Sequence, residues 1–131
     1  MQGYVAFSAY PLETRRYSNG TTVQFDNAIT NIGESYYKEL GIFQCPIDGI
    51  YLFSISFQTG VNAFMHGHIV KNGVGLLSSW AENENDVQSS TVVVTECLAL
   101  ETVWVECIGD NRELLGNDRS SFSGILITPY V

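Results

Sequence analysis

Positive charge is scarce in this chain. Its 131 residues include 6 Lys and Arg side chains against 14 Asp and Glu, which gives a formal net charge of −8. Proteins that bind nucleic acid need a positively charged surface to neutralise the phosphates, so the composition argues against a nucleic-acid partner. The same deficit argues against simple electrostatic attraction to anionic membranes. Cations, neutral glycans and basic protein surfaces remain open as partners.

Long apolar runs are absent from the sequence, and so is the spacing of an amphipathic helix. No segment approaches the roughly 20 apolar residues that a membrane-spanning helix requires, so we expect no membrane insertion. No linker, low-complexity segment or internal repeat divides the chain, and we expect a single domain over residues 1–131. No signal peptide is visible, which fits either an intracellular chain or a mature domain with an added start methionine.

Cysteine is sparse, and the three cysteines cannot all pair within the chain. Cys97 and Cys107 are expected on adjacent arms of a hairpin, where they could face each other and leave Cys45 unpaired. The alternative is three buried free thiols, because cysteine is among the most frequently buried residue types. The cysteine count therefore does not decide the redox compartment.

The residues of a catalytic centre are also few. His66 and His68 are the chain's two histidines, and no Gly-x-Ser-x-Gly nucleophile turn is present. No glycine-rich phosphate loop precedes a helix. We therefore expect no enzymatic activity and no required cofactor.

The clearest structural signal lies between Phe43 and Phe57. Tyr51, Phe53 and Ile55 alternate with smaller residues, which predicts a β-strand with one aromatic face. We expect this strand to be central, with its aromatic face turned into the core. Many further short alternating segments are separated by turn signals such as Asn72-Gly73, which indicates an antiparallel β-sandwich or jelly roll.

Several fixed spacings resemble the signature of the complement 1q globular-head family, within the complement 1q and tumour necrosis factor superfamily. The matching positions are Phe25, Asn31, Tyr36, Phe43, Gly49, Tyr51 and Phe53, with Ile55 in place of the final aromatic. Flanking matches are Val5-Ala6-Phe7-Ser8-Ala9, Lys71-Asn72-Gly73, Val103-Trp104-Val105 and Ser121-Phe122-Ser123-Gly124-Ile125-Leu126. The resemblance covers essentially the whole chain.

This resemblance implies a ten-stranded antiparallel jelly roll of the tumour-necrosis-factor type, a homotrimer, and secretion to the extracellular space. The chain has no Gly-X-Y repeat, so it resembles either an isolated globular head or one of the stalkless members common in invertebrates. Those members often act in innate immunity as lectin-like pattern-recognition proteins that bind microbial or self glycans. Two alternatives stay open: a cytokine-like or hormone-like ligand of a protein receptor, and a matrix protein that only trimerises.

Aromatic residues are more numerous than one small sandwich readily hides, with 7 Tyr, 7 Phe and 2 Trp. Some are therefore expected at subunit contacts. The candidates are Phe64, Trp80, Trp104 and Phe122. The alternative is that all of them fit into the core.

Two polar segments are candidates for ligand binding. Carboxylates and amides suit calcium, and some relatives hold calcium in the corresponding region, so Glu84 and Asp86 are candidate calcium ligands, with Asn83 beside them. The second segment, residues 109–120, offers groups that suit sugar hydroxyls or carboxylates. These are Asn111, Arg112, Asn117, Asp118 and Arg119. Plain solvation of both loops is the alternative.

The histidines give a weaker hypothesis. On a strand, residues i and i+2 project from the same face, roughly 6.6 Å apart along the chain. His66 and His68 could therefore share a transition metal if an acid completed the set of ligands. The alternative is a polar outer face or a pair at a trimer contact.

Overall fold

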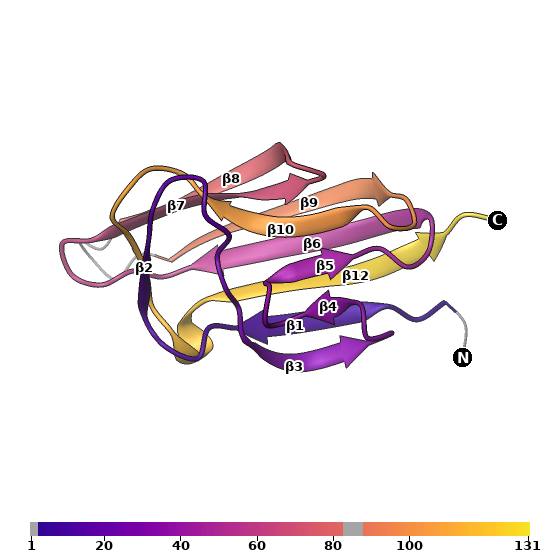
Figure 1. Ribbon diagram of the computed structural model, residues 1–131, viewed down its shortest axis with the longest axis horizontal. Coiled ribbons are helices and arrows are strands. Elements are labelled where there is room, and N and C mark those ends of the chain that lie inside the picture. Colours follow the sequence, from indigo (N-terminus) through magenta and orange to yellow (C-terminus); the bar gives the residue numbers. More distant parts are fainter. Residues whose placement is uncertain (1–2, 83–87) are drawn as a thin grey trace.

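The computed structural model describes residues 3–82 and 88–131, which form two antiparallel β-sheets packed face to face (Figure 1). The first sheet contains, in spatial order, β3 (Asn27–Ile32), β1 (Ala6–Tyr10), β12 (Ser121–Pro129), β6 (Gly49–Phe57) and β9 (Ser89–Cys97). The second contains β4 (Tyr36–Tyr37), β5 (Ile42–Gln44), β10 (Thr102–Cys107), β7 (Phe64–Lys71) and β8 (Val74–Glu82). The predicted sandwich of ten antiparallel strands is confirmed.

A smaller pair of strands lies at one end of the sandwich. β2 (Arg15–Tyr17) pairs with β11 (Arg112–Leu114), and the short 3-10 helix η1 (Asn117–Arg119) follows. This end lies opposite the end at which β1 begins and β12 finishes (Figure 1). In the described part of the chain, no helix is long and apolar enough to cross a membrane.

The predicted central strand is β6, which lies between β12 and β9. Its residues alternate strictly between buried and half-buried positions, and Tyr51, Phe53 and Phe57 are completely inaccessible to solvent. Each buried aromatic ring removes roughly 150–250 Å² from water, or about 4–6 kcal/mol before entropy is subtracted. The prediction of an inward aromatic face is therefore confirmed, and this strand anchors the core.

Phe122 belongs to this core and not to a subunit contact. It is completely buried, and its ring packs edge-on against Phe7 at 4.8 Å between centroids. The alternation of β12 turns Phe122, Gly124 and Leu126 inward together. A side chain at Gly124 would collide with the rings of Phe7 and Phe53. The prediction that Phe122 lies at a subunit interface is therefore wrong.

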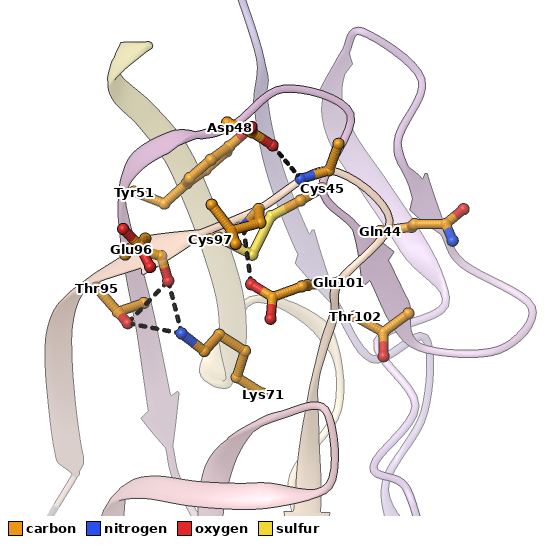
Figure 2. Close-up of a disulfide and its surroundings, with 12 residues drawn as sticks. Gln44, Cys45, Asp48, Tyr51, Lys71, Thr95, Glu96, Cys97, Glu101 and Thr102 are labelled. Atoms are coloured by element: carbon orange, nitrogen blue, oxygen red, sulfur yellow. Dashed lines mark hydrogen bonds between the residues drawn. A yellow bond between two sulfur atoms is a disulfide. The ribbon is translucent and has the colours of Figure 1, made fainter. Parts of the chain in front are cut away.

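The cysteine pairing differs from both expectations. Cys45, just after β5, forms a disulfide with Cys97 at the end of β9 (Figure 2). β9 and β10 are not arms of one hairpin, because the chain crosses from the first sheet to the second between Cys97 and Thr102. Cys107 lies opposite Gly67 in the second sheet and stays buried as a free thiol.

Acidic side chains fix the crossing that carries the disulfide. The Glu101 carboxylate accepts a hydrogen bond from the Leu98 amide at 2.7 Å, and Asp48 accepts one from the Ala99 amide at 2.6 Å. Lys71, at the end of β7 in the second sheet, donates to the Glu96 carbonyl oxygen on β9 of the first sheet at 2.7 Å (Figure 2). These contacts and the disulfide join the two sheets at the end where β12 finishes.

Candidate functional site

The outer face of the first sheet is unusually apolar. Its outward-facing isoleucines and valines are between 48% and 67% exposed. They are Ile29 and Ile32 on β3, Ile125 and Ile127 on β12, and Val92 and Val94 on β9. An antiparallel sheet with one solvated face normally alternates apolar and polar residues, so this face is typical of a contact surface.

Strand pairing organises this face into rows that run across the sheet. One continuous apolar row crosses all five strands through Ile32, Ala6, Ile125, Leu52 and Val94. The parallel row two residues along contains Thr30, Ser8, Ser123, Ser54 and Val92. We call these outward residues of the first sheet the apolar face.

A shallow hollow of about 290 Å³ lies between the two rows. Leu52 and Ile125 supply its apolar wall, and Ser8 and Ser123, whose hydroxyls lie 2.8 Å apart, supply the polar one. Small residues leave this space open in the middle of the apolar face. A hollow there can receive a protruding side chain from another molecule.

The outer face of the second sheet carries a different group of side chains, at the end near β2 and β11. Phe64 and Trp80 stack with 5.3 Å between ring centroids, and the guanidinium carbon of Arg112 lies 4.1 Å from the Phe64 centroid. The His66 ring packs edge-on to Trp80 at 4.9 Å. We call Phe64, His66, Trp80 and Arg112 the aromatic–arginine cluster. Cation–π attraction and stacking hold it together.

The main chain of the preceding turn positions Arg112. Its Nε donates to the Ile108 carbonyl oxygen and its Nη1 donates to that of Asp110, each at 3.0 Å. Gly109 has a φ of +88°, and a Cβ there would lie 2.2 Å from Arg112 Nη2. Glycine is therefore required at this position for two reasons. It adopts the left-handed backbone conformation of the turn, and it leaves room for the guanidinium group.

The two histidines share the outward face of β7, as predicted, but they have different surroundings. Burial lowers the pKa of His66 from its usual value, and the nearby positive charge of Arg112 and the neighbouring His68 lower it further. His68 Nε2 lies 3.6 Å from a carboxylate oxygen of Glu106. Within residues 3–82 and 88–131, no group of three or more His, Cys, Asp or Glu side chains could hold a metal ion. The predicted histidine metal site therefore lacks a third ligand from this part of the protein.

The ligand-binding residues predicted in the segment 109–120 lie at two separate positions in the structure. Asn111 accepts a hydrogen bond from Arg16 at 3.1 Å, beside Arg112 and the cluster. Asn117 begins η1, where its amide donates to the Pro11 carbonyl oxygen at 2.6 Å, and Asp118 and Arg119 follow as exposed residues. The candidate calcium residues Glu84 and Asp86, with Asn83, lie outside the described residues, so calcium binding stays a prediction.

Residues 6–127 match the C1q domain family. This chain belongs to that family. Mouse Multimerin-2 is 28% identical over 106 residues, which are 80% of this chain and 11% of that protein. Mouse Complement C1q tumor necrosis factor-related protein 1 is 26% identical over 113 residues, 82% of this chain and 40% of that protein. The chain thus spans less than half the length of these curated relatives.

Solved structures confirm the jelly-roll fold of this C1q domain. The globular domain of zebrafish complement 1qA protein has a TM-score of 0.79 at 22% identity, with 96% of this chain and 99% of that chain covered. Eiger TNF from S. frugiperda has a TM-score of 0.80 at 10% identity, with 99% and 96% covered. The tumour-necrosis-factor-like architecture predicted from the sequence is therefore the architecture of this C1q domain.

Whether Phe64, Trp80 and Trp104 contact a neighbouring subunit stays a prediction, and the structure places them away from the apolar face. Phe64, Trp80 and Trp104 lie in strands of the second sheet, whereas the exposed apolar face of this C1q domain belongs to the first. Two unbroken apolar runs in the sequence could have predicted the apolar face. They are Val92-Val93-Val94 and Ile125-Leu126-Ile127. A strand with one solvated face alternates, so unbroken apolar runs indicate that both faces are covered.

Proposed function

We propose that this C1q domain is a secreted, homotrimeric recognition module that binds glycans in a lectin-like, pattern-recognition role in innate immunity. C1q and tumour necrosis factor domains are ligand-binding modules that typically form trimers. The observation that carries the trimeric assembly is the apolar face, whose continuous row crosses five strands. Three copies that bury this face against one another remove the exposed isoleucines and valines from water.

Light scattering tests the assembly. Wild-type protein should have three times the chain mass of 14.5 kDa at micromolar concentration. Val94→Lys with Ile125→Lys places two charges in the apolar row and should give a folded monomer. The matched control is Leu40→Lys, which changes an exposed leucine in the turn before β5 and should stay trimeric. A monomeric wild-type protein would contradict the proposal.

A glycan array, read with and without millimolar calcium, tests the recognition role. Selective binding to a set of glycans supports a lectin, and loss of binding in EDTA would support calcium ligation by the segment around Glu84 and Asp86. Weak single-site binding should be multiplied by three sites on a patterned surface. A confirmed trimer that binds no glycan would contradict the lectin role but not the proposed trimeric assembly.

A second candidate function is that of a signalling ligand for a protein receptor. It is supported by a mainly apolar hollow of about 270 Å³ on the outside of the second sheet, between Tyr37, Leu40 and Ile42. An apolar surface of this kind suits a protein contact better than a sugar. The prediction is saturable binding to a cell-surface protein that Leu40→Lys weakens, together with a blank glycan array.

A further inference from the structure

We propose that the aromatic–arginine cluster and the hollow beside it bind one sugar residue that carries a carboxylate group. Arg112 would pair with the carboxylate, and Trp80 would pack against the ring of the sugar. This inference rests on the proposed glycan-binding function and names the class of glycan and the site that selects it.

The charge of Arg112 is the first argument. Arg15 lies 3.0 Å from Asp26, and Arg16 lies 3.3 Å from Glu113. Arg112 has no carboxylate within 4.0 Å among the residues that the structure describes, although the chain carries a net charge of −8. Because an arginine is always charged, an anion is the natural partner of this position.

The guanidinium group is also held ready for a ligand. Arginine has five N–H donors, and two of those of Arg112 are used on the carbonyl oxygens of Ile108 and Asp110. The group lies over Phe64, so its orientation is fixed before any ligand arrives. A pre-oriented arginine loses little conformational entropy on binding, and its fork matches the two oxygens of a carboxylate.

Trp80 supplies an ordered aromatic surface next to this charge. Its indole Nε1 donates to Glu82 at 2.7 Å, which satisfies the polar edge of the ring, and 44% of the residue remains exposed. A half-exposed tryptophan with a satisfied N–H offers mainly apolar ring surface. The C–H groups on one side of a pyranose are complementary to such a surface.

The adjoining hollow has a size and a lining that suit one sugar ring. It measures about 260 Å³ and is lined by His66, His68, Gly75, Leu77, Ser78 and Ile108, among others. Small-ligand pockets run from roughly 300 to 1,000 Å³, so this hollow fits a single ring and not a long segment. Its imidazoles and the Ser78 hydroxyl can form hydrogen bonds with sugar hydroxyls. Leu77 and Ile108 can pack against the ring carbons.

Two details indicate that the hollow is specifically shaped. A Cβ at Gly75 would lie 2.5 Å from Nδ1 of His68, so this glycine makes room for the imidazole. His68 Nε2 is buried and has no hydrogen-bond partner in the described part of the protein, with the Glu106 carboxylate 3.6 Å away. His66 belongs to both the cluster and the hollow, so the two form one continuous surface.

The test compares two oligosaccharide probes that differ in one group. One ends in glucuronic acid, and the other ends in glucose, in which a CH₂OH group replaces the carboxylate. Titration calorimetry on the intact wild-type protein should show at least about tenfold tighter binding of the acidic probe, since a charge-assisted pair contributes roughly 1.5–3 kcal/mol. Arg112→Gln should equalise the two affinities, and Trp80→Ala should weaken both.

The controls separate the site from the fold and from the lectin role. Lys38→Gln removes an equal charge from the turn between β4 and β5 and should keep the acidic preference. Arg112→Lys retains the charge without the fork and should keep part of the preference, and it replaces Arg112→Gln if the latter fails to fold. Glycan binding with no acidic preference, or a preference that survives both changes at Arg112, overturns this site and leaves the lectin role. A trimer that binds no glycan overturns both.

Discussion

At the scale of single residues, Asp26 makes a testable contribution to stability. Its carboxylate accepts hydrogen bonds from the Leu12 amide at 2.8 Å and from Arg15 at 3.0 Å. Partial burial opposes ionisation of this group, but the two hydrogen bonds and the Arg15 charge outweigh it and lower the pKa of Asp26. The folded state therefore binds fewer protons than the unfolded state, and the stabilisation is lost as pH falls through the acidic range.

Asp26→Asn should lower the free energy of unfolding at pH 7 by about 1–2 kcal/mol, because a charged hydrogen-bond acceptor is removed. It should also flatten the decline in melting temperature between pH 6 and pH 3. Glu39→Gln, in an exposed turn, is the control and should leave the decline unchanged. A decline as steep in the Asp26 variant as in the wild type would show that other groups cause it.

A second prediction at this scale concerns Cys107. Burial raises the pKa of its thiol to about 11; the positive charge of Arg112 lowers this pKa, and the negative charge of Asp110 raises it. The thiolate is the reactive form, so the folded protein should keep this cysteine protonated and inert. Ellman's reagent at pH 8 should label no thiol in the native protein and one thiol per chain after denaturation. Rapid labelling of the native protein would contradict this.

At the scale of strands and sheets, the Cys45–Cys97 disulfide should be the main covalent contribution to stability. It joins residues 52 positions apart and links the end of β5 to the end of β9 across the sandwich. Loss of a native disulfide in a small domain typically reduces stability by about 2–5 kcal/mol. Cys45→Ala with Cys97→Ala should therefore unfold at clearly lower urea concentration than the wild type.

Unfolding in the presence of reductant distinguishes the stability contributed by the disulfide from that contributed by side-chain packing. Reductant should destabilise the wild type and leave the double variant unaffected, and Cys107→Ala should respond to reductant as the wild type does. Equal responses of the wild type and the double variant would show that the disulfide does not form in solution.

The same scale explains how much of the fold could be predicted from the sequence. Strands such as β6 were predictable because the alternation of Tyr51, Phe53 and Ile55 is local. The sheet that each strand joins is not local. The crossing between Cys97 and Thr102 resembles a hairpin turn in sequence, so the disulfide partner was missed. The family signature, which spans the chain, supplied the topology that local patterns lack.

The candidate site was predictable only in parts. Phe64 and Arg112 were both singled out, but for different roles, since 48 positions separate them. They meet because β11 pairs with β2 at the end of the sandwich where β7 begins. No spacing rule predicts such a contact. The cluster became visible only once the fold was known.

At the scale of the whole molecule, our proposals assign a different function to each outer face of the sandwich: assembly to the first sheet and glycan binding to the second. The apolar face lies outside the first sheet, and the aromatic–arginine cluster lies outside the second. Assembly through the first sheet would leave each cluster uncovered on the outside of the trimer. Three identical sites on one rigid body would then face a patterned surface together.

This arrangement predicts that assembly and single-site affinity can be separated. Val94→Lys with Ile125→Lys should reduce binding to a surface densely coated with the recognised glycan by about 10²–10⁴-fold, because three linked sites are replaced by one. The affinity for the same glycan free in solution should not change, since neither residue belongs to the cluster. Surface plasmon resonance and calorimetry measure the two quantities. If the monomeric variant lost both kinds of binding equally, the site would need contributions from neighbouring copies, and the separation of tasks between the two sheets would be wrong.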